Sequence, residues 1–404
     1  MTFSENKLII AILIGAVAGI LSGCIFGTAM VSVVWIGDLF LDALKMMIVP
    51  LVIAAVISGV TSLGDIRKLG KVGGATLIYY ASTTALAVLI GLLVVNLIQP
   101  GVGIGQAGTA LSEEISNKAN TGFVDIIRSM ISPNIISAAA DMKLLPLIVF
   151  CLLFAAALTT IGDKNVTIIK FFDGLNEVMM KLVIWVMAFA PIGIFALIAG
   201  KIGSAGGAEA IQQELIAVGS YCFTVILGLS IHFIVLFIIL ILFSNQGRTY
   251  LIKLLRALVT AFGTASSSAT LPLTMECALE AGVDKRSVKF VLPIGATINM
   301  DGTALYESVA VMFIAQAYGI SMGIGEQTII FITATLAAIG AAGIPQAGLV
   351  TMLIVLEAVN LPAEGIGLIL AVDWFLDRFR TTVNVWGDSV GAAVIESYLP
   401  KDRE

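Results

Sequence analysis

Long apolar segments follow one another along the whole chain, separated by short polar connections. At about 20 residues for each membrane-crossing helix, they predict spans rather than soluble core helices. The eight predicted spans cover residues 8–36, 39–62, 74–99, 143–162, 176–200, 217–244, 287–318 and 363–396. Two further apolar segments, 257–281 and 327–361, are interrupted near the middle by small residues.

Basic residues set the expected topology, because loops rich in Lys and Arg stay in the cytoplasm. Basic clusters flank segment 257–281 on both sides, so this segment must enter and leave the membrane by the same face. Its small-residue break at 263–269 suits a re-entrant hairpin. Segment 327–361 repeats the pattern from the opposite face, with its break at 340–348. The pattern predicts an all-α integral membrane protein with eight transmembrane helices and two re-entrant helical hairpins, typical of an inverted-repeat secondary transporter. A channel with pore loops is the competing interpretation.

Composition agrees with a membrane as the solvent. Hydrophobic residues make up 59% of the 404 residues, charged residues only 12%, and mean hydropathy is +1.05. The formal net charge is −5, and no basic run with interleaved aromatic residues suggests nucleic acid as a partner. The serine run 266–268 lacks the GxSxG pattern of a hydrolase. We therefore expect a lipid-embedded protein that is not an enzyme and carries no cofactor.

The last apolar segment carries an unusual polar stripe. Asp373, Asp377, Arg380, Asn384 and Asp388 are spaced by four, three, four and four residues, which places them on one face of a helix. Charges at membrane depth are costly, so they require partners or a function. A self-neutralising ladder of ion pairs is one interpretation. The other is a binding site for a zwitterion with an acidic side chain.

The second interpretation gives each group a chemical role. Asp377 suits an ammonium group, and the planar fork of Arg380 suits a side-chain carboxylate. Asn384 can bind the main-chain carboxylate or a cation, and Asp388 offers hard oxygen ligands to sodium.

An upstream stretch, 295–307, adds further polar residues at membrane depth. Helical spacing places Asn299, Thr303 and Glu307 on one face and turns Asp301 toward another. The run from Asn299 to Gly302 favours local unwinding, which frees backbone carbonyls for a monovalent cation. Glu307 is a candidate proton carrier or, alternatively, a neutral structural residue.

Two more groups supply oxygen and nitrogen donors. Residues 266–268 can offer hydroxyl and backbone groups to a carboxylate where a half-helix begins at the hairpin tip. Tyr80, Thr83 and Thr84 place three hydroxyls on adjacent turns of one span, which on their own would be ordinary packing groups.

Four motifs in this order resemble the glutamate transporter family of dicarboxylate/amino acid:cation symporters. They are Ser266-Ser267-Ser268-Ala269-Thr270-Leu271-Pro272, Asn299-Met300-Asp301-Gly302-Thr303, Ala342-Gly343-Ile344-Pro345-Gln346-Ala347-Gly348 and the stretch 377–388. The resemblance covers essentially the whole chain, 1–404, as one integral-membrane unit. It implies a homotrimer with a scaffold of 8–72 and 143–200, and a transport domain of 74–99 and 217–399 that moves like an elevator. The hairpin at 327–361 would be the external gate.

The resemblance also implies roles for individual residues. The implied substrate ligands are Ser267, Thr303, Ile344, Gly348, Asp377, Arg380, Thr381 and Asn384. The first implied sodium site is Gly295, Asn299, Asn384 and Asp388; the second is Thr297, Ala338, Ile339 and Ala341; the third is Tyr80, Thr83, Thr84 and Asp301, with Asn299. Glu307 and Arg378 would take part in proton and potassium coupling, as in the animal members.

Arg380 sorts this chain within the family, because neutral amino acid exchangers have a small or uncharged residue there. The expected function is sodium-coupled symport of L-glutamate or L-aspartate, with proton co-transport and potassium counter-transport. A C4-dicarboxylate symporter and a substrate-gated anion channel are the alternatives. Short termini favour a bacterial inner membrane, with both termini cytoplasmic.

Overall fold

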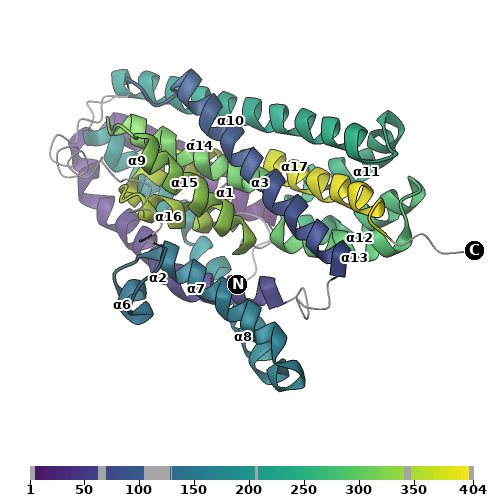
Figure 1. Cartoon of the computed structure of the whole chain (residues 1–404). Helices are drawn as coiled ribbons and strands as arrows, with labels where there is room; N and C mark the ends of the chain where they lie inside the picture. Colours follow the sequence, from purple (N-terminus) through teal and green to yellow (C-terminus); the bar gives the residue numbers. More distant parts are fainter. Residues whose placement is uncertain are drawn as a thin grey trace, which may run out of the picture.

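The computed structural model describes residues 5–61, 70–103, 128, 130–204, 208–340 and 347–399. Within those ranges the chain is helical, with turns and short connections and no strand. The long helix α10 (Ala208–Phe243) lies along one edge of the molecule, and α8 (Val166–Met187) projects at the opposite edge (Figure 1).

Several helices are long and apolar enough to cross a membrane. In the described part of the chain these are Ile10–Thr61, Lys71–Ile98 and Ile216–Phe243. The first is a continuous helical stretch of 52 residues that contains most of α1 (Glu5–Phe26) and all of η1 (Gly27–Val33) and α2 (Val34–Thr61). A fourth candidate is the pair formed by α8 and α9 (Ala190–Ser204), which bends by 51° between Val166–Met187 and Ala190–Gly200. The sequence placed this span at 176–200, but α8 begins earlier, at Val166. The polar side chains of 166–177 hid its start, and one of them, Asp173, accepts a hydrogen bond from Ser58 at 2.6 Å.

A first group of helices packs around α2. It comprises α1 (Glu5–Phe26), η1 (Gly27–Val33), α2 (Val34–Thr61), α6 (Ile135–Ala140), α7 (Leu144–Thr160), η3 (Gly162–Asn165), α8 and α9. Helix α1 packs closely against α9 through Gly15, Gly19 and Gly23, where an added Cβ would meet α9 atoms. Small residues at this spacing let two helix backbones approach each other in a membrane.

A second group contains the polar segments singled out in the sequence. It comprises α3 (Gly70–Ile98), α10, α11 (Arg248–Thr264), α12 (Ser267–Glu280), α13 (Lys285–Ile298), α14 (Asp301–Ala317), α15 (Ile324–Gly340), α16 (Ala347–Ala358), η4 (Ala363–Leu368) and α17 (Leu370–Glu396). Helix α17 packs against α3, α10, α11, α13 and α14, so its polar stripe lies among them.

Helices α11 and α12 form an antiparallel hairpin. The Arg256 guanidinium of α11 contacts Glu276 at 3.0 Å and Glu280 at 3.2 Å, near the far end of α12. At the other end, the Thr264 and Thr270 hydroxyls lie 3.1 Å apart. The turn uses Ala265 in the left-handed region (φ 49°), which is uncommon for a residue with a Cβ. The sequence predicted a break here. Helices α15 and α16 also pack together, but their connection, 341–346, lies outside the described residues.

Candidate functional site

The predicted unwinding at Asn299 is present in the structure. Helix α13 ends at Ile298 and α14 begins at Asp301, with Asn299 and Met300 in non-helical conformations between them. The break exposes backbone groups that a continuous helix would satisfy. One of them, the Gly302 N–H, donates to the Asn384 side-chain oxygen of α17 at 2.7 Å. The break is therefore supported by the polar stripe.

Asp301 lies at the centre of a buried polar cluster. Its Oδ1 accepts hydrogen bonds from the Thr84 hydroxyl at 2.7 Å and the Thr83 hydroxyl at 3.3 Å, both on α3. Its Oδ2 lies 3.1 Å from His232 Nε2 on α10. Three helices thus meet at one carboxylate, which has no exposed surface.

Asn299 joins this cluster to Asp388. Its Nδ2 donates to Asp388 Oδ1 at 3.0 Å, and its Oδ1 accepts from Thr84 at 3.4 Å. Gly295 lies directly against Asp388 and the Tyr80 hydroxyl, which donates to the Val291 carbonyl at 2.8 Å.

One expectation from helical spacing was wrong. Asp301 was expected to face away from Asn299, yet both reach the Thr84 hydroxyl. The spacing argument assumed a continuous helix, and the break at Asn299 and Met300 changes the direction in which the two side chains leave the backbone.

This cluster offers the donor groups that bind hard metal cations. Asp301 and Asp388 are buried carboxylates, and in the described part of the chain neither forms a salt bridge with lysine or arginine. Buried charges need a counterion or dense hydrogen bonding. Hydroxyl, amide and carboxylate oxygens surround them, and these are ligands that hard cations prefer.

Arg380 is the centre of a second buried cluster. Its Nη1 donates to Asp373 at 2.9 Å and its Nη2 to Asp377 at 2.7 Å. Its Cζ lies over the Tyr306 ring, 3.9 Å from the ring centroid. Gly348 of α16 lies so close that an added Cβ would be 2.8 Å from Arg380 Nη1. Helix α16 therefore lies directly against the arginine.

The other predicted substrate residues are Thr303, Asn384, Thr381, Ser267 and Ile344. Asn384 Nδ2 donates to the Thr303 hydroxyl at 3.3 Å, and Thr381 is buried on the same helix. Ser267 is buried as the first residue of α12. Ile344, and Ala341 of the second sodium site, lie outside the described residues.

The other members of the second predicted sodium site are less closely joined. Thr297 is exposed, and its hydroxyl donates to the Ile294 carbonyl of its own helix at 2.8 Å. Ala338 is buried on α15. Gly59 of α2 lies close to the Ile339 carbonyl and to the Ile298 side chain, so the ends of α13 and α15 come near the same glycine.

The two residues expected to take part in ion coupling occupy different places. Glu307 is fully buried on α14. Its polar neighbours are Thr351 of α16 and the Arg380 guanidinium. The Arg378 Nη1 donates to the carbonyls of Phe262 and Gly263 at 3.0 and 2.9 Å. Arg378 therefore holds the C-terminal end of α11, where the helix dipole favours a cation.

Sequence reasoning left three contacts unseen. His232 was not assigned a role, although it reaches Asp301. Tyr306 was not expected beneath Arg380, and Asp373 was not distinguished from the rest of the stripe. A lone histidine in a very apolar helix was the one available signal, because such a group needs a partner.

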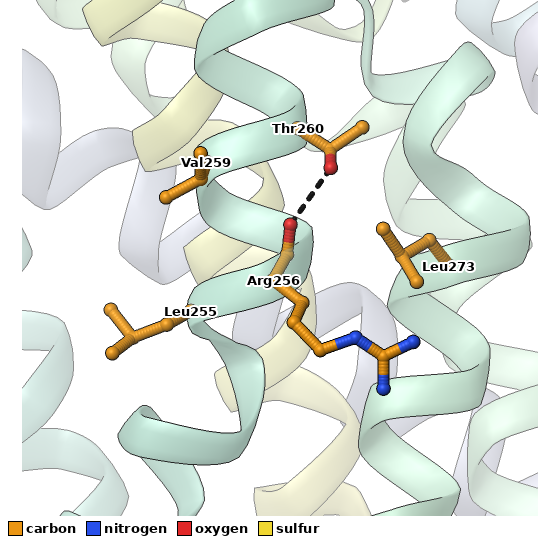
Figure 2. A pocket seen from close by; sticks show the side chains of 5 residues that line it. All are labelled: Leu255, Arg256, Val259, Thr260 and Leu273. Atoms are coloured by element: carbon orange, nitrogen blue, oxygen red, sulfur yellow. Dashed lines mark hydrogen bonds between the residues drawn. The ribbon is translucent and has the colours of Figure 1, made fainter.

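A surface hollow lies apart from both clusters, between α11 and α12 (Figure 2). Its lining residues are Leu255, Arg256, Val259, Thr260 and Leu273. The Thr260 hydroxyl donates to the Arg256 carbonyl at 2.8 Å, as Figure 2 shows. Arg256 is already paired with glutamates of α12, and no predicted site residue lines this hollow.

Apolar spanning helices around buried charged clusters and a broken helix define a multi-pass membrane transporter. Residues 8–398 match the model of the Sodium:dicarboxylate symporter family. The chain belongs to this family, so it is a transporter and not an enzyme, and sodium is a coupling ion of the family rather than a cofactor.

Its relatives include animal transporters. Excitatory amino acid transporter 3 of Homo sapiens is 40% identical over 91% of this chain and 79% of its own length. An excitatory amino acid transporter of Caenorhabditis elegans is 39% identical over 91% and 82%, respectively. Excitatory amino acid transporter 2 of Homo sapiens is 37% identical over 96% and 77%.

Proposed function

We propose that this protein is a sodium-coupled symporter of acidic amino acids, L-glutamate or L-aspartate, working by elevator-type alternating access. The observation that carries the proposal is the buried pair formed by Arg380 and Asp377 at 2.7 Å. The names of the related excitatory amino acid transporters support the same substrate class.

A zwitterionic substrate can replace this pair at little cost. Its ammonium group offers Asp377 a cation, and its side-chain carboxylate offers Arg380 a bidentate anion. Each partner exchanges one ion pair for another, so neither is left buried and uncompensated. Thr303, Asn384, Thr381, Ser267, Gly348 and Ile344 complete the proposed pocket, with Ser267 at the start of α12.

Sodium is the proposed counterion of Asp301 and Asp388, which form no salt bridge with lysine or arginine among the described residues. One proposed site uses Gly295, Asn299, Asn384 and Asp388, and a third uses Tyr80, Thr83, Thr84 and Asp301. The second proposed site, from Thr297, Ala338, Ile339 and Ala341, rests on the family resemblance. Because Asn384 contacts both the helix break and Thr303, sodium and substrate binding reinforce each other.

Glu307 is the proposed proton carrier, and Arg378 supports the animal-like cycle with potassium counter-transport. The support for Glu307 is its complete burial on α14 near Arg380, where a carboxyl group must be neutralised or paired. Arg378 supports the cycle by holding the end of the first hairpin.

The proposed architecture has eight spans and two re-entrant hairpins in an inverted repeat. The proposed scaffold, residues 8–72 and 143–200, includes α2 and forms a homotrimer. The proposed transport domain, residues 74–99 and 217–399, includes α17 and slides in the lipid bilayer. The proposed location is a bacterial inner membrane with both termini in the cytoplasm.

Uptake into proteoliposomes tests the proposal. Radiolabelled L-glutamate and L-aspartate are offered with an inward sodium gradient, and internal potassium is present or replaced by choline. We expect accumulation above the external concentration that requires sodium and is lost in Arg380→Ala. Succinate is the comparison substrate, and its accumulation instead of the amino acids would favour a C4-dicarboxylate symporter. Anion current without accumulation would favour a channel.

A further inference from the structure

The only histidine of the chain, His232, lies on α10 and has no exposed surface. Its Nε2 lies 3.1 Å from Asp301 Oδ2. A carboxylate only accepts hydrogen bonds, so the ring nitrogen that faces it must carry the proton. The other ring nitrogen, Nδ1, has no hydrogen-bond partner among the described residues, so a proton there would be buried without an acceptor. The contact therefore selects the tautomer with hydrogen on Nε2.

The two oxygens of the Asp301 carboxylate have different hydrogen-bond partners. Oδ1 receives both threonine hydroxyls of α3, and Oδ2 receives the imidazole of α10. Gly387 of α17 lies beside Oδ2, where an added Cβ would be 3.0 Å away. Both oxygens of the Asp301 carboxylate are therefore held in place, and a rotation about the Cβ–Cγ bond would break at least one of these contacts.

We infer that His232 is a positioning residue that holds the Asp301 carboxylate in the orientation needed to bind sodium. The inference rests on the proposed sodium site at Asp301. His232 does not touch sodium in this role; it acts through Asp301. Hydrogen-bond partners that orient a metal-binding carboxylate contribute to affinity although they are not ligands themselves.

Nitrogen NMR offers a direct test, because a single histidine gives a single pair of ring signals. The protein is labelled with ¹⁵N-histidine, purified with an affinity tag that contains no histidine, and titrated with sodium chloride against choline chloride. We expect hydrogen on Nε2 and a shift of the Nε2 signal with sodium only. Hydrogen on Nδ1, or ring signals that ignore sodium, would overturn the inference.

Two substitutions separate positioning from packing. His232→Gln can place an amide N–H near the position of Nε2, whereas His232→Met fills the space without a donor. We expect the sodium half-saturation of substrate binding to rise about 10- to 100-fold in His232→Met and to stay within about threefold in His232→Gln. Maximum binding at saturating sodium is retained in both.

Thr224→Ala is the matched control on the same helix. Thr224 is also fully buried, but among the described residues its hydroxyl bonds only the Ser220 carbonyl of α10, at 2.7 Å. The control should leave sodium dependence unchanged. Equal sodium dependence in His232→Gln and His232→Met would overturn the inference. Sodium-independent substrate binding in the unsubstituted protein would instead overturn the proposed function, and the two failures are distinguishable because the imidazole signals report sodium without substrate.

Discussion

The Tyr306 ring forms a flat floor beneath the guanidinium of Arg380, with Cζ 3.9 Å from the ring centroid and both side chains fully buried. The aspartates bind two edges of the guanidinium, and the aromatic face covers one side. Because α14 supplies the ring and α17 the arginine, the orientation of the arginine depends on the packing of these two helices.

Removing the ring should weaken substrate binding more than removing its hydroxyl. A cation over an aromatic face in a desolvated site gains about 2 kcal/mol, so Tyr306→Leu should raise the KM for uptake by at least about tenfold. Tyr306→Phe keeps the face and should stay within about threefold of the original KM. Sodium-driven uptake over a range of substrate concentrations measures both values, and equal KM values in the two variants would contradict the role of the ring.

A methyl group at Gly387 should disturb sodium binding. Its Cβ would lie 3.0 Å from Asp301 Oδ2 and 3.2 Å from Asn299 Nδ2, closer than ordinary van der Waals contact. Both side chains are fixed by other bonds, so we expect Gly387→Ala to raise the sodium half-saturation by about threefold or more. Gly219→Ala on α10 is the control, because an added Cβ there would meet nothing within 4 Å. A normal sodium response in Gly387→Ala would show that the cluster shifts freely.

Arg378→Ala should loosen the first hairpin. It removes two charge-assisted bonds from the end of α11, and we expect the free energy of unfolding to fall by about 1 to 2 kcal/mol. Arg256→Ala is the comparison, since its exposed ion pairs should contribute less than about 1 kcal/mol. Thermal unfolding in detergent ranks the two variants. A larger loss in Arg256→Ala would show that the surface pairs, rather than the helix end, hold the hairpin.

Asp284 should give the start of α13 a pH-dependent stability. The Arg286 guanidinium donates to this carboxylate and makes the largest contribution to lowering its pKa. The Arg286 backbone N–H also donates to it and lowers the pKa further. A folded-state pKa below the unfolded value adds stability above about pH 4, and this contribution is lost as the pH falls through the folded-state pKa. As the N-cap of α13, Asp284 should contribute about 1 kcal/mol at pH 7. The unfolding-temperature gap to Asp284→Ala should therefore shrink from pH 7 to pH 3, and a constant gap would contradict the assignment.

The sequence predicted features that depend on spacing along one helix. The stripe from Asp373 to Asp388 is buried on one helix, and the chain breaks at Asn299 and Met300 and turns at Ala265. Periodicity and small or polar residues inside apolar runs identify such features, because a membrane penalises both unpaired charges and unsatisfied backbone.

Contacts between helices could not be read in this way. The sequence separation between His232 and Asp301 is 69 residues, and no spacing rule connects them. The stripe showed that Arg380 has acidic neighbours three and seven positions earlier, but side-chain rotamers decide that it binds both. The expectation for Asp301 failed because its helical face was counted through a break.

The bond from Gly302 N–H to Asn384 makes the fold of one helix depend on a side chain of another. Sodium bound between these helices would therefore also stabilise their packing. A ligand at about a hundred times its Kd adds about 2.7 kcal/mol to the free energy of unfolding. The unfolding temperature would then rise with the sodium concentration around the protein. The ions that drive transport would also stabilise the folded carrier.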